Sequence, residues 1–231
     1  TINHQSLIAT KSNRICTAAG DRVVMEFGAR RAHGYDAAYY GARAAIIGGC
    51  KGTSCVKTAK DFGTPASGTM AHSWVQLYKD EYTAFKTYAE KYPDSCTLLI
   101  DTYDVLKSGV PNAIRCFDEV LKPKGFRPKG VRIDSGDIAY LSKKVREKLD
   151  AAGYTDCAVV VSNSLDEHLI KQLDMQGAKI NSFGIGERLI TASSEAVFGG
   201  VYKLAAVETK DGEIIPKIKI IKPAKAIGKI S

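Results

Sequence analysis

The amino-acid sequence predicts an α/β protein built as an irregular (β/α) barrel or an open doubly wound sheet. Four short apolar runs, at 97–100, 130–133, 157–161 and 180–183, each end in a polar or glycine-rich turn. The first three turns lead into segments with a helical spacing of apolar residues. Each run is apolar at nearly every position, which is typical of parallel strands buried on both faces between helices. Alternation of such strands with helices favours these two architectures.

Three further segments extend the predicted sheet. Residues 23–26, 44–49 and 201–208 carry short apolar runs of strand character. Together with the first set they give about seven strands, close to the eight of a complete barrel. We therefore expect functional side chains on the turns at the carboxyl ends of the strands, which share one mouth in both architectures.

Helices are predicted after the strands at 130–133 and 157–161. Apolar residues over 138–149 recur every three or four positions, which forms one stripe of a helix, and Gly153 stands just beyond it. A second stripe runs over 165–173 and is followed by Gly177. Glycine at these positions is typical of a helix end.

Composition and charge narrow the class of protein. The 231 residues are 45% hydrophobic and 25% charged, as in ordinary soluble domains. No apolar run approaches the roughly 20 residues of a membrane-spanning helix, and no signal-peptide pattern opens the chain, so we expect a cytoplasmic protein without a membrane partner. The six cysteines form no CxxC pair, and we expect neither disulfides nor structural zinc.

The net charge of +8 suits either a nucleic acid or a small anionic substrate. The densest basic segments, 143–148 and 217–229, have the character of a solvated helix face and a terminal tail. We therefore expect a small anionic substrate and no nucleic-acid partner.

The predicted strand ends carry basic, acidic and glycine residues that suit a sugar phosphate. Guanidinium groups and backbone amides beside glycines bind phosphate oxygens directly. Paired carboxylates suit ribose hydroxyls or Mg²⁺, which prefers oxygen ligands and retains water. In chain order the candidates are Phe27, Gly28, Arg30, Arg31, Lys51, Gly52, Thr53, Ser54, His72, Asp101, Asp104, Arg132, Asp134, Asn163, Ser164, Gly184 and Gly186.

Single signals at these turns also have ordinary structural interpretations. Asp134 or Ser135 could cap the helix that follows, because both side chains accept hydrogen bonds from first-turn amides. The sequence GIG at 184–186 falls far short of a dinucleotide fingerprint, and no GxxxxGK[ST] loop occurs. His72 follows small residues, where an imidazole could meet a ligand without crowding.

Eight motifs, taken together and in order, resemble the nicotinate phosphoribosyltransferase family. They are INHQSLIATK, EFGARRAHG, GTMAHSWV, LLIDTYD, VRIDSGD, VSNSLDE, FGIGERL and FGGVYKL. The resemblance implies the irregular barrel of the type II phosphoribosyltransferases, with the end of an N-terminal domain or connector at 1–22, the catalytic barrel at 23–207 and a C-terminal extension at 208–231. Family members begin with a further α/β domain, and this chain opens on Thr1, so we expect that domain to be largely missing and both ends to be incomplete.

The resemblance also implies the reaction. Nicotinate and phosphoribosyl pyrophosphate would give nicotinate mononucleotide and pyrophosphate, with coupled ATP hydrolysis, in NAD salvage. His72 would accept a phosphoryl group from ATP, since a neutral imidazole is nucleophilic near pH 7. Arg132, Asp134 and Asp101 would complete the catalytic set, with Mg²⁺ near the two aspartates.

Substrate contacts follow from the same motifs. Phe27 would stack on the pyridine ring, and Arg30 would hold an anionic group together with Arg132. A homodimer is implied, in which the N-terminal domain of a partner supplies a tyrosine for the other face of the ring. The remaining substrate-binding residues are Thr53 and Ser54, and Asn163, Ser164, Gly184 and Gly186, which would cradle the phosphate of the product.

Several alternatives remain open at this point. Related nicotinamide-using enzymes carry a carboxylate where Ser54 stands, and serine there favours nicotinate over nicotinamide as the substrate. A quinolinate phosphoribosyltransferase shares the fold class, but the sequence shows no extra basic cluster for a second substrate carboxylate. A non-catalytic module that binds a phosphosugar is the alternative outside the enzymes.

Overall fold

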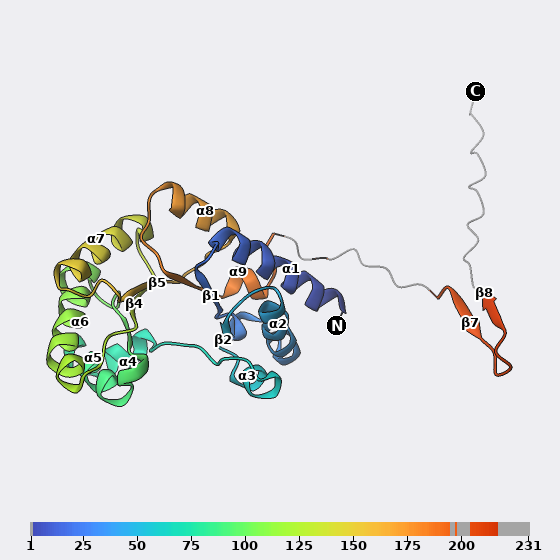
Figure 1. The fold of residues 1–231 in the computed structure, drawn as a ribbon, viewed down its shortest axis with the longest axis horizontal. Helices are drawn as coiled ribbons and strands as arrows, with labels where there is room; N and C mark the ends of the chain where they lie inside the picture. Colours follow the sequence, from blue (N-terminus) through green and yellow to red (C-terminus); the bar gives the residue numbers. More distant parts are fainter. Residues whose placement is uncertain (1, 195–196, 198–203, 217–231) are drawn as a thin grey trace, which may run out of the picture. The chain divides into compact units, whose positions relative to one another are not determined.

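The computed structural model describes residues 2–194, 197 and 204–216, which fall into two compact units divided after residue 198 (Figure 1). The elements of the first unit are α1 (Ile2–Ala19), β1 (Val23–Glu26), α2 (Tyr35–Ile47), β2 (Gly52–Thr53), α3 (Val56–Phe62), α4 (His72–Leu77), α5 (Glu81–Lys91), β3 (Thr97–Leu99), α6 (Val110–Cys116), β4 (Gly130–Ile133), α7 (Ile138–Ala151), β5 (Ala158–Val161), α8 (Glu167–Met175), β6 (Ser182–Ile185) and α9 (Glu187–Ile190). Helix α6 lies between two π-helical turns, Val105–Gly109 and Phe117–Leu121, and short 3₁₀ turns occupy Ala29–Arg31, Pro93–Ser95 and Lys122–Lys124.

Strands β1 to β6 form one parallel sheet in the order β2-β1-β6-β5-β4-β3. The sheet curls into a half-barrel, and the helices lie around its outer side (Figure 1). The predicted (β/α)-barrel class is therefore confirmed. Because all strands run the same way, their carboxyl ends lie at one edge, where the predicted site residues stand.

Two details of the predicted sheet are wrong. Residues 44–47 belong to α2, and only the four residues 48–51 separate that helix from β2, so the strand expected at 44–49 does not exist. The strand expected at 201–208 lies partly outside the described residues. Its described end, β7 (Ala206–Glu208), pairs antiparallel with β8 (Ile214–Pro216) in a two-stranded sheet of the second unit.

Burial of the strands is also less complete than expected. In β1 and β5, buried residues alternate with half-buried ones. The helices cover the outer face of the curled sheet, while the side chains on its inner face remain partly accessible. This alternation leaves the inner face free to carry polar groups such as Arg132.

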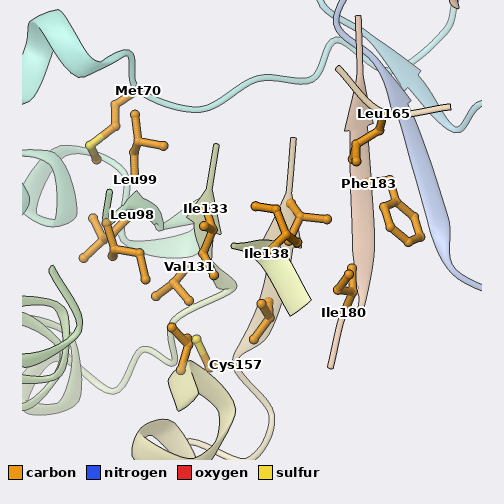
Figure 2. Close-up of a cluster of buried hydrophobic side chains, with 14 of the residues drawn as sticks. Met70, Leu98, Leu99, Val131, Ile133, Ile138, Cys157, Leu165, Ile180 and Phe183 are labelled. Carbon is orange, nitrogen blue, oxygen red and sulfur yellow. The ribbon is translucent and has the colours of Figure 1, made fainter. Parts of the chain in front are cut away.

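The outer face of the sheet and the helices share one apolar core. Figure 2 shows Leu98 of β3, Val131 and Ile133 of β4 and Phe183 of β6 within it. Their exposures do not exceed 1%, and full burial of side chains of this size contributes about 1.5–3 kcal/mol each. The strands that carry the site are therefore fixed from behind by the core.

The helices expected after β4 and β5 are confirmed as α7 and α8. Gly153 and Gly177 follow their ends with positive φ angles of 80° and 70°, where glycine avoids the strain of a side chain.

The residue that caps the N-terminus of α7 differs from the two candidates that the sequence offered. Asp137, not Asp134 or Ser135, caps α7, because its Oδ1 accepts a hydrogen bond from the Tyr140 amide at 3.0 Å.

Helix α1 packs against α2 and α8 within the first unit. Lys11 of α1 and Glu167 of α8 form an ion pair at 2.8 Å between side chains that are only 5% and 9% exposed. The domain boundaries at 22 and 207 stay predictions. Among the described residues, no helix has the length and apolar character needed to cross a membrane.

Candidate active site

Arg132 is the centre of a hydrogen-bond network at the carboxyl edge of the sheet. It occupies the third position of β4, between the buried residues Val131 and Ile133, so its side chain extends from the opposite, inner face. The guanidinium donates from Nε to Ser162 Oγ at 2.8 Å, from Nη1 to Thr69 Oγ1 at 2.7 Å and from Nη2 to Asp134 Oδ1 at 2.7 Å. These three bonds fix the plane of the guanidinium.

Asp134 is held as a carboxylate by this network. Burial raises its pKa, but a hydrogen bond from Ser162 and the charge and hydrogen bond of Arg132 outweigh that effect and keep the pKa below the ordinary aspartate value. Asp134 therefore carries a negative charge throughout the neutral range.

His72 and Asp101 form a second pair beside the first. His72 begins α4, and its Nε2 lies 3.1 Å from Oδ1 of Asp101, whose side chain is 1% exposed. The other oxygen of Asp101 accepts hydrogen bonds from the Asp134 amide at 3.1 Å and the Ser135 hydroxyl at 2.6 Å. As a donor to Asp101, Nε2 carries the ring proton, which leaves Nδ1 of His72 as the nucleophilic nitrogen. The His72 side chain is 39% exposed, so a ligand can reach it.

Phe27 provides the aromatic surface of the site. Its ring centroid lies 5.5 Å from the guanidinium carbon of Arg132, within the range of a cation–π contact. Gly184 of β6 makes room for the ring, because a Cβ at that position would lie 2.4 Å from Phe27 Cδ2. A Cβ on Gly186 would lie 2.9 Å from the Phe27 carbonyl oxygen. The two glycines thus allow Phe27 to lie against the end of β6.

Two cavities meet at Phe27, Arg30, Arg132 and Asp134. The smaller has a volume of about 120 Å³ and the larger about 580 Å³. The smaller is also lined by Arg31, Ser162, Asn163, Ser164, Gly184, Gly186 and Glu187, and the larger by Ala29, Ser54, Gly68, Thr69, Met70, Ala71, His72, Ser73 and Leu99. The smaller cavity is therefore the glycine-lined and amide-lined end of the site, and the larger cavity is its histidine-containing end. Arg132 and the ring of Phe27 lie between the two ends.

Most of the predicted site residues lie on these cavities. Arg30 is exposed and lines both, and no carboxylate among the described residues lies within ion-pair distance of it. Asn163 adopts a φ of 113°, which is unusual for a residue other than glycine. Thr53 is different, because it is fully buried and its hydroxyl donates to Glu26 at 2.5 Å. The structure does not bring Thr53 to either cavity.

Sequence reasoning missed three residues of the site. Thr69 and Ser162 supply acceptors for Arg132, and Glu26 binds Thr53. Ser162 and Glu26 stand at strand ends, where the rule that placed the other candidates applies equally. Thr69 gave no signal, since it lies in an extended segment before α4.

The residues present offer little direct coordination for Mg²⁺. Both oxygens of Asp101 are engaged by His72, Ser135 and the Asp134 amide. Within the described residues no group of three His, Cys, Asp or Glu side chains could hold a metal ion. This donor set fits an ion that enters with the phosphate oxygens of a substrate and keeps most of its water, which is ordinary for Mg²⁺. It does not fit a resident metal held by Asp101.

The half-barrel and its strand-end pocket define a (β/α)-barrel protein with arginine, aromatic and carboxylate side chains at the carboxyl edge of its sheet. The chain belongs to the nicotinate phosphoribosyltransferase (NAPRTase) family, whose model matches residues 23–231. It is 55% identical to nicotinate phosphoribosyltransferase of Bacillus subtilis over 221 residues, which are 95% of this chain and 44% of that protein. It is 40% identical to nicotinate phosphoribosyltransferase pncB2 of Mycobacterium tuberculosis, over 97% of this chain and 48% of the relative.

Solved structures give the same result for the fold. Human nicotinic acid phosphoribosyltransferase matches with a TM-score of 0.71 at 27% identity, over 80% of this chain and 48% of the human chain. A nicotinate-nucleotide pyrophosphorylase from Pyrococcus furiosus matches with a TM-score of 0.70 at 27% identity, over 96% of this chain and 61% of the other. The chain spans about half the length of the curated relatives that it matches.

Proposed function

We propose that this chain carries the site of a nicotinate phosphoribosyltransferase, which converts nicotinate and phosphoribosyl pyrophosphate into nicotinate mononucleotide and pyrophosphate in NAD salvage. The observation that carries the proposal is the position of Arg132, which contacts Phe27, Asp134, Thr69 and Ser162 where the two cavities meet. A fixed guanidinium beside an aromatic ring suits a flat pyridine with a carboxylate.

The two cavities suit the two ends of the sugar phosphate. Displacement at the anomeric carbon develops positive charge on the ribosyl ring and negative charge on the departing pyrophosphate. The carboxylate of Asp134 stands beside this reacting position and complements the positive charge. Arg30, exposed on both cavities, suits the pyrophosphate, and Mg²⁺ bound to that group would neutralise further negative charge. Asn163, Ser164, Gly184 and Gly186 suit the phosphate of the product nucleotide.

His72 is proposed as the group that couples ATP hydrolysis to turnover. Its Nε2 is bound to Asp101, so the attacking nitrogen would be Nδ1. Attack on the γ-phosphorus of ATP forms the N–P bond, breaks the bond to the bridging oxygen and releases ADP. Hydrolysis of the phosphohistidine then returns the free imidazole and inorganic phosphate. Asp101 holds the ring and stabilises its positive charge in both steps.

Ser54 supports nicotinate over nicotinamide. It lines the larger cavity, where a carboxylate would repel the negative charge of nicotinate and accept from the amide of nicotinamide. A serine hydroxyl avoids that repulsion. Ser54→Asp should therefore lower the turnover of nicotinate relative to nicotinamide, measured as a ratio of kcat/KM values.

Product analysis with three pyridines tests the proposal. The purified protein is incubated with phosphoribosyl pyrophosphate, Mg²⁺ and ATP, and with nicotinate, nicotinamide or quinolinate in turn, and nucleotides are separated by chromatography. We expect kcat/KM for nicotinate to exceed the other two at least tenfold, a difference of ~1.4 kcal/mol. Preference for either other pyridine would overturn the substrate assignment. Calorimetric binding of phosphoribosyl pyrophosphate without any product would favour a non-catalytic phosphosugar-binding module.

The proposal includes a cytoplasmic homodimer. Phe27 would contact one side of the pyridine ring, and a partner subunit would complete the other side. Sedimentation of the protein with and without phosphoribosyl pyrophosphate tests this part separately, and a monomer at all concentrations would contradict it.

A further inference from the structure

Glu26 is a carboxylate in an unusual position. It is the last residue of β1, directly before Phe27, and its exposed fraction is 0%. Within the described residues, no lysine or arginine pairs with it. Burial raises its pKa above the ordinary glutamate value, even though hydrogen bonds from Thr53 and Gly28 act in the opposite direction. An ionisable group at such a place is costly unless donors compensate it, and a strand end that served packing alone would carry an apolar side chain.

The two oxygens of Glu26 bind two different segments. Oε1 accepts a hydrogen bond from the Gly28 amide, and Oε2 accepts one from the Thr53 hydroxyl at 2.5 Å. The backbone adds a third connection, since the Ser54 amide donates to the Glu26 carbonyl at 2.8 Å. Glu26 therefore joins the end of β1 to the end of β2, and we name Glu26, Gly28 and Thr53 the carboxylate clamp.

Strand β2 is the shortest strand of the parallel sheet. It has two residues, and its strand pairing is confined to Met25–Gly52 and Glu26–Thr53. A single bridge joins Thr53 to Ala66 on its other side. Backbone hydrogen bonds from Lys51 to Val24, from Thr53 to Pro65 and from Ser67 to Thr53 also hold this segment, and the clamp adds the side-chain connection nearest to Ser54.

The position of Gly28 is equally tight. A Cβ there would lie 2.5 Å from Ile190 Cβ and 2.8 Å from Glu26 Oε1. The backbone of 28 is thus pressed between α9 and the Glu26 carboxylate. Phe27 lies between Glu26 and Gly28 in the chain, so the contacts of these two residues also fix the distance of its ring from the Arg132 guanidinium.

We propose that Glu26 is a positioning residue that fixes Phe27 and Ser54 around the pyridine ring and so determines the affinity for nicotinate. The inference rests on the proposed function and assigns the clamp to one substrate only. The clamp touches Phe27 and Ser54 through the backbone, whereas Asn163, Ser164 and Gly186 follow other strands. Loss of the clamp should therefore raise KM for nicotinate far more than KM for phosphoribosyl pyrophosphate, although Arg30 follows Gly28 by two residues.

Thr53 supplies a matched pair of variants. Thr53→Val keeps the shape and removes the hydroxyl that donates to Glu26, while Thr53→Ser keeps the hydroxyl. We expect Glu26→Gln and Thr53→Val each to raise KM for nicotinate about tenfold, with kcat and KM for phosphoribosyl pyrophosphate changed by less than about threefold. Thr53→Ser should match the wild type. The double variant should lose less than the sum of the two single effects, because both variants disrupt the hydrogen bond between Thr53 and Glu26, while Thr53→Val also removes the acceptor of the Cys55 amide.

Two results would overturn the inference. One is an unchanged KM for nicotinate in Thr53→Val, which also decides the matter if Glu26→Gln does not fold. The other is an equal rise in both KM values, which would assign Glu26 a general structural role. If the wild-type protein forms no product, the proposed function fails by itself. In that case, hydrogen exchange at the Gly28 amide tests the clamp independently. Exchange should be at least about tenfold faster in Glu26→Met than in the wild type, and an unchanged rate would overturn the inference.

Discussion

Replacement of Arg132 by lysine tests the organisation of the site most sharply. The guanidinium binds three acceptors on three segments: Thr69 before α4, Asp134 after β4 and Ser162 after β5. A lysine ammonium keeps the charge but cannot reach all three, because its donors radiate from one nitrogen. At least two hydrogen bonds are lost, at about 0.5–1.5 kcal/mol each, for a total of about 1–3 kcal/mol.

The consequence is measurable as a change in catalytic efficiency. A loss above ~1.4 kcal/mol corresponds to a decrease of at least tenfold in kcat/KM for the formation of nicotinate mononucleotide. Arg127→Lys is the matched control, since Arg127 pairs with Asp156 on the surface and both side chains are 52% exposed. The control should stay within about twofold of the wild type. An Arg132→Lys variant with unchanged kinetics would refute the reasoning and reduce Arg132 to a structural residue.

Three other variants test the remaining groups. His72→Ala should abolish acid-labile phosphorylation by labelled ATP while calorimetry still detects nicotinate binding; retained labelling would exclude His72 as the acceptor. The pKa of Asp134 is lower in the folded than in the unfolded chain, so ionised Asp134 stabilises the fold above the ordinary aspartate pKa, and this stabilisation is lost as pH falls through the folded pKa. Asp134→Asn should thus flatten the acid limb of the Tm–pH curve, and an unaltered limb would contradict the shift. Gly184→Ala places a Cβ 2.4 Å from Phe27 Cδ2 and should raise KM for nicotinate about tenfold; an unchanged KM would show that the ring is not part of the pyridine site.

Sequence patterns predicted the strands that have helices after them. Strands β3, β4 and β5 and helices α7 and α8 were found because each combines an apolar run, a polar turn and a helical stripe. The strand predicted at 44–49 was wrong, because a short apolar run that ends in glycine fits a strand and the end of a helix equally well. The alanines over 37–45 favour the helix, and the core packing of Ala44 and Ala45 decided it.

The site was predictable to the extent that strand ends share one mouth. Arg132, Asp134 and Asp101 come together as that rule requires, and His72 joins them from the start of α4. The rule gives a position along the chain and not the direction of a side chain, which is why Thr53 was assigned to the ligand although its hydroxyl binds Glu26. The contact between Thr69 and Arg132 joins segments 63 positions apart, and only the folded chain reveals it.

An experimental structure of the protein with nicotinate mononucleotide tests the central claim most directly. The account predicts the pyridine ring against Phe27, its carboxylate within hydrogen-bond distance of Arg132, and the phosphate at Asn163, Ser164 and Gly186. A nucleotide bound elsewhere on the chain, or bound here with the pyridine and phosphate ends exchanged, would contradict it.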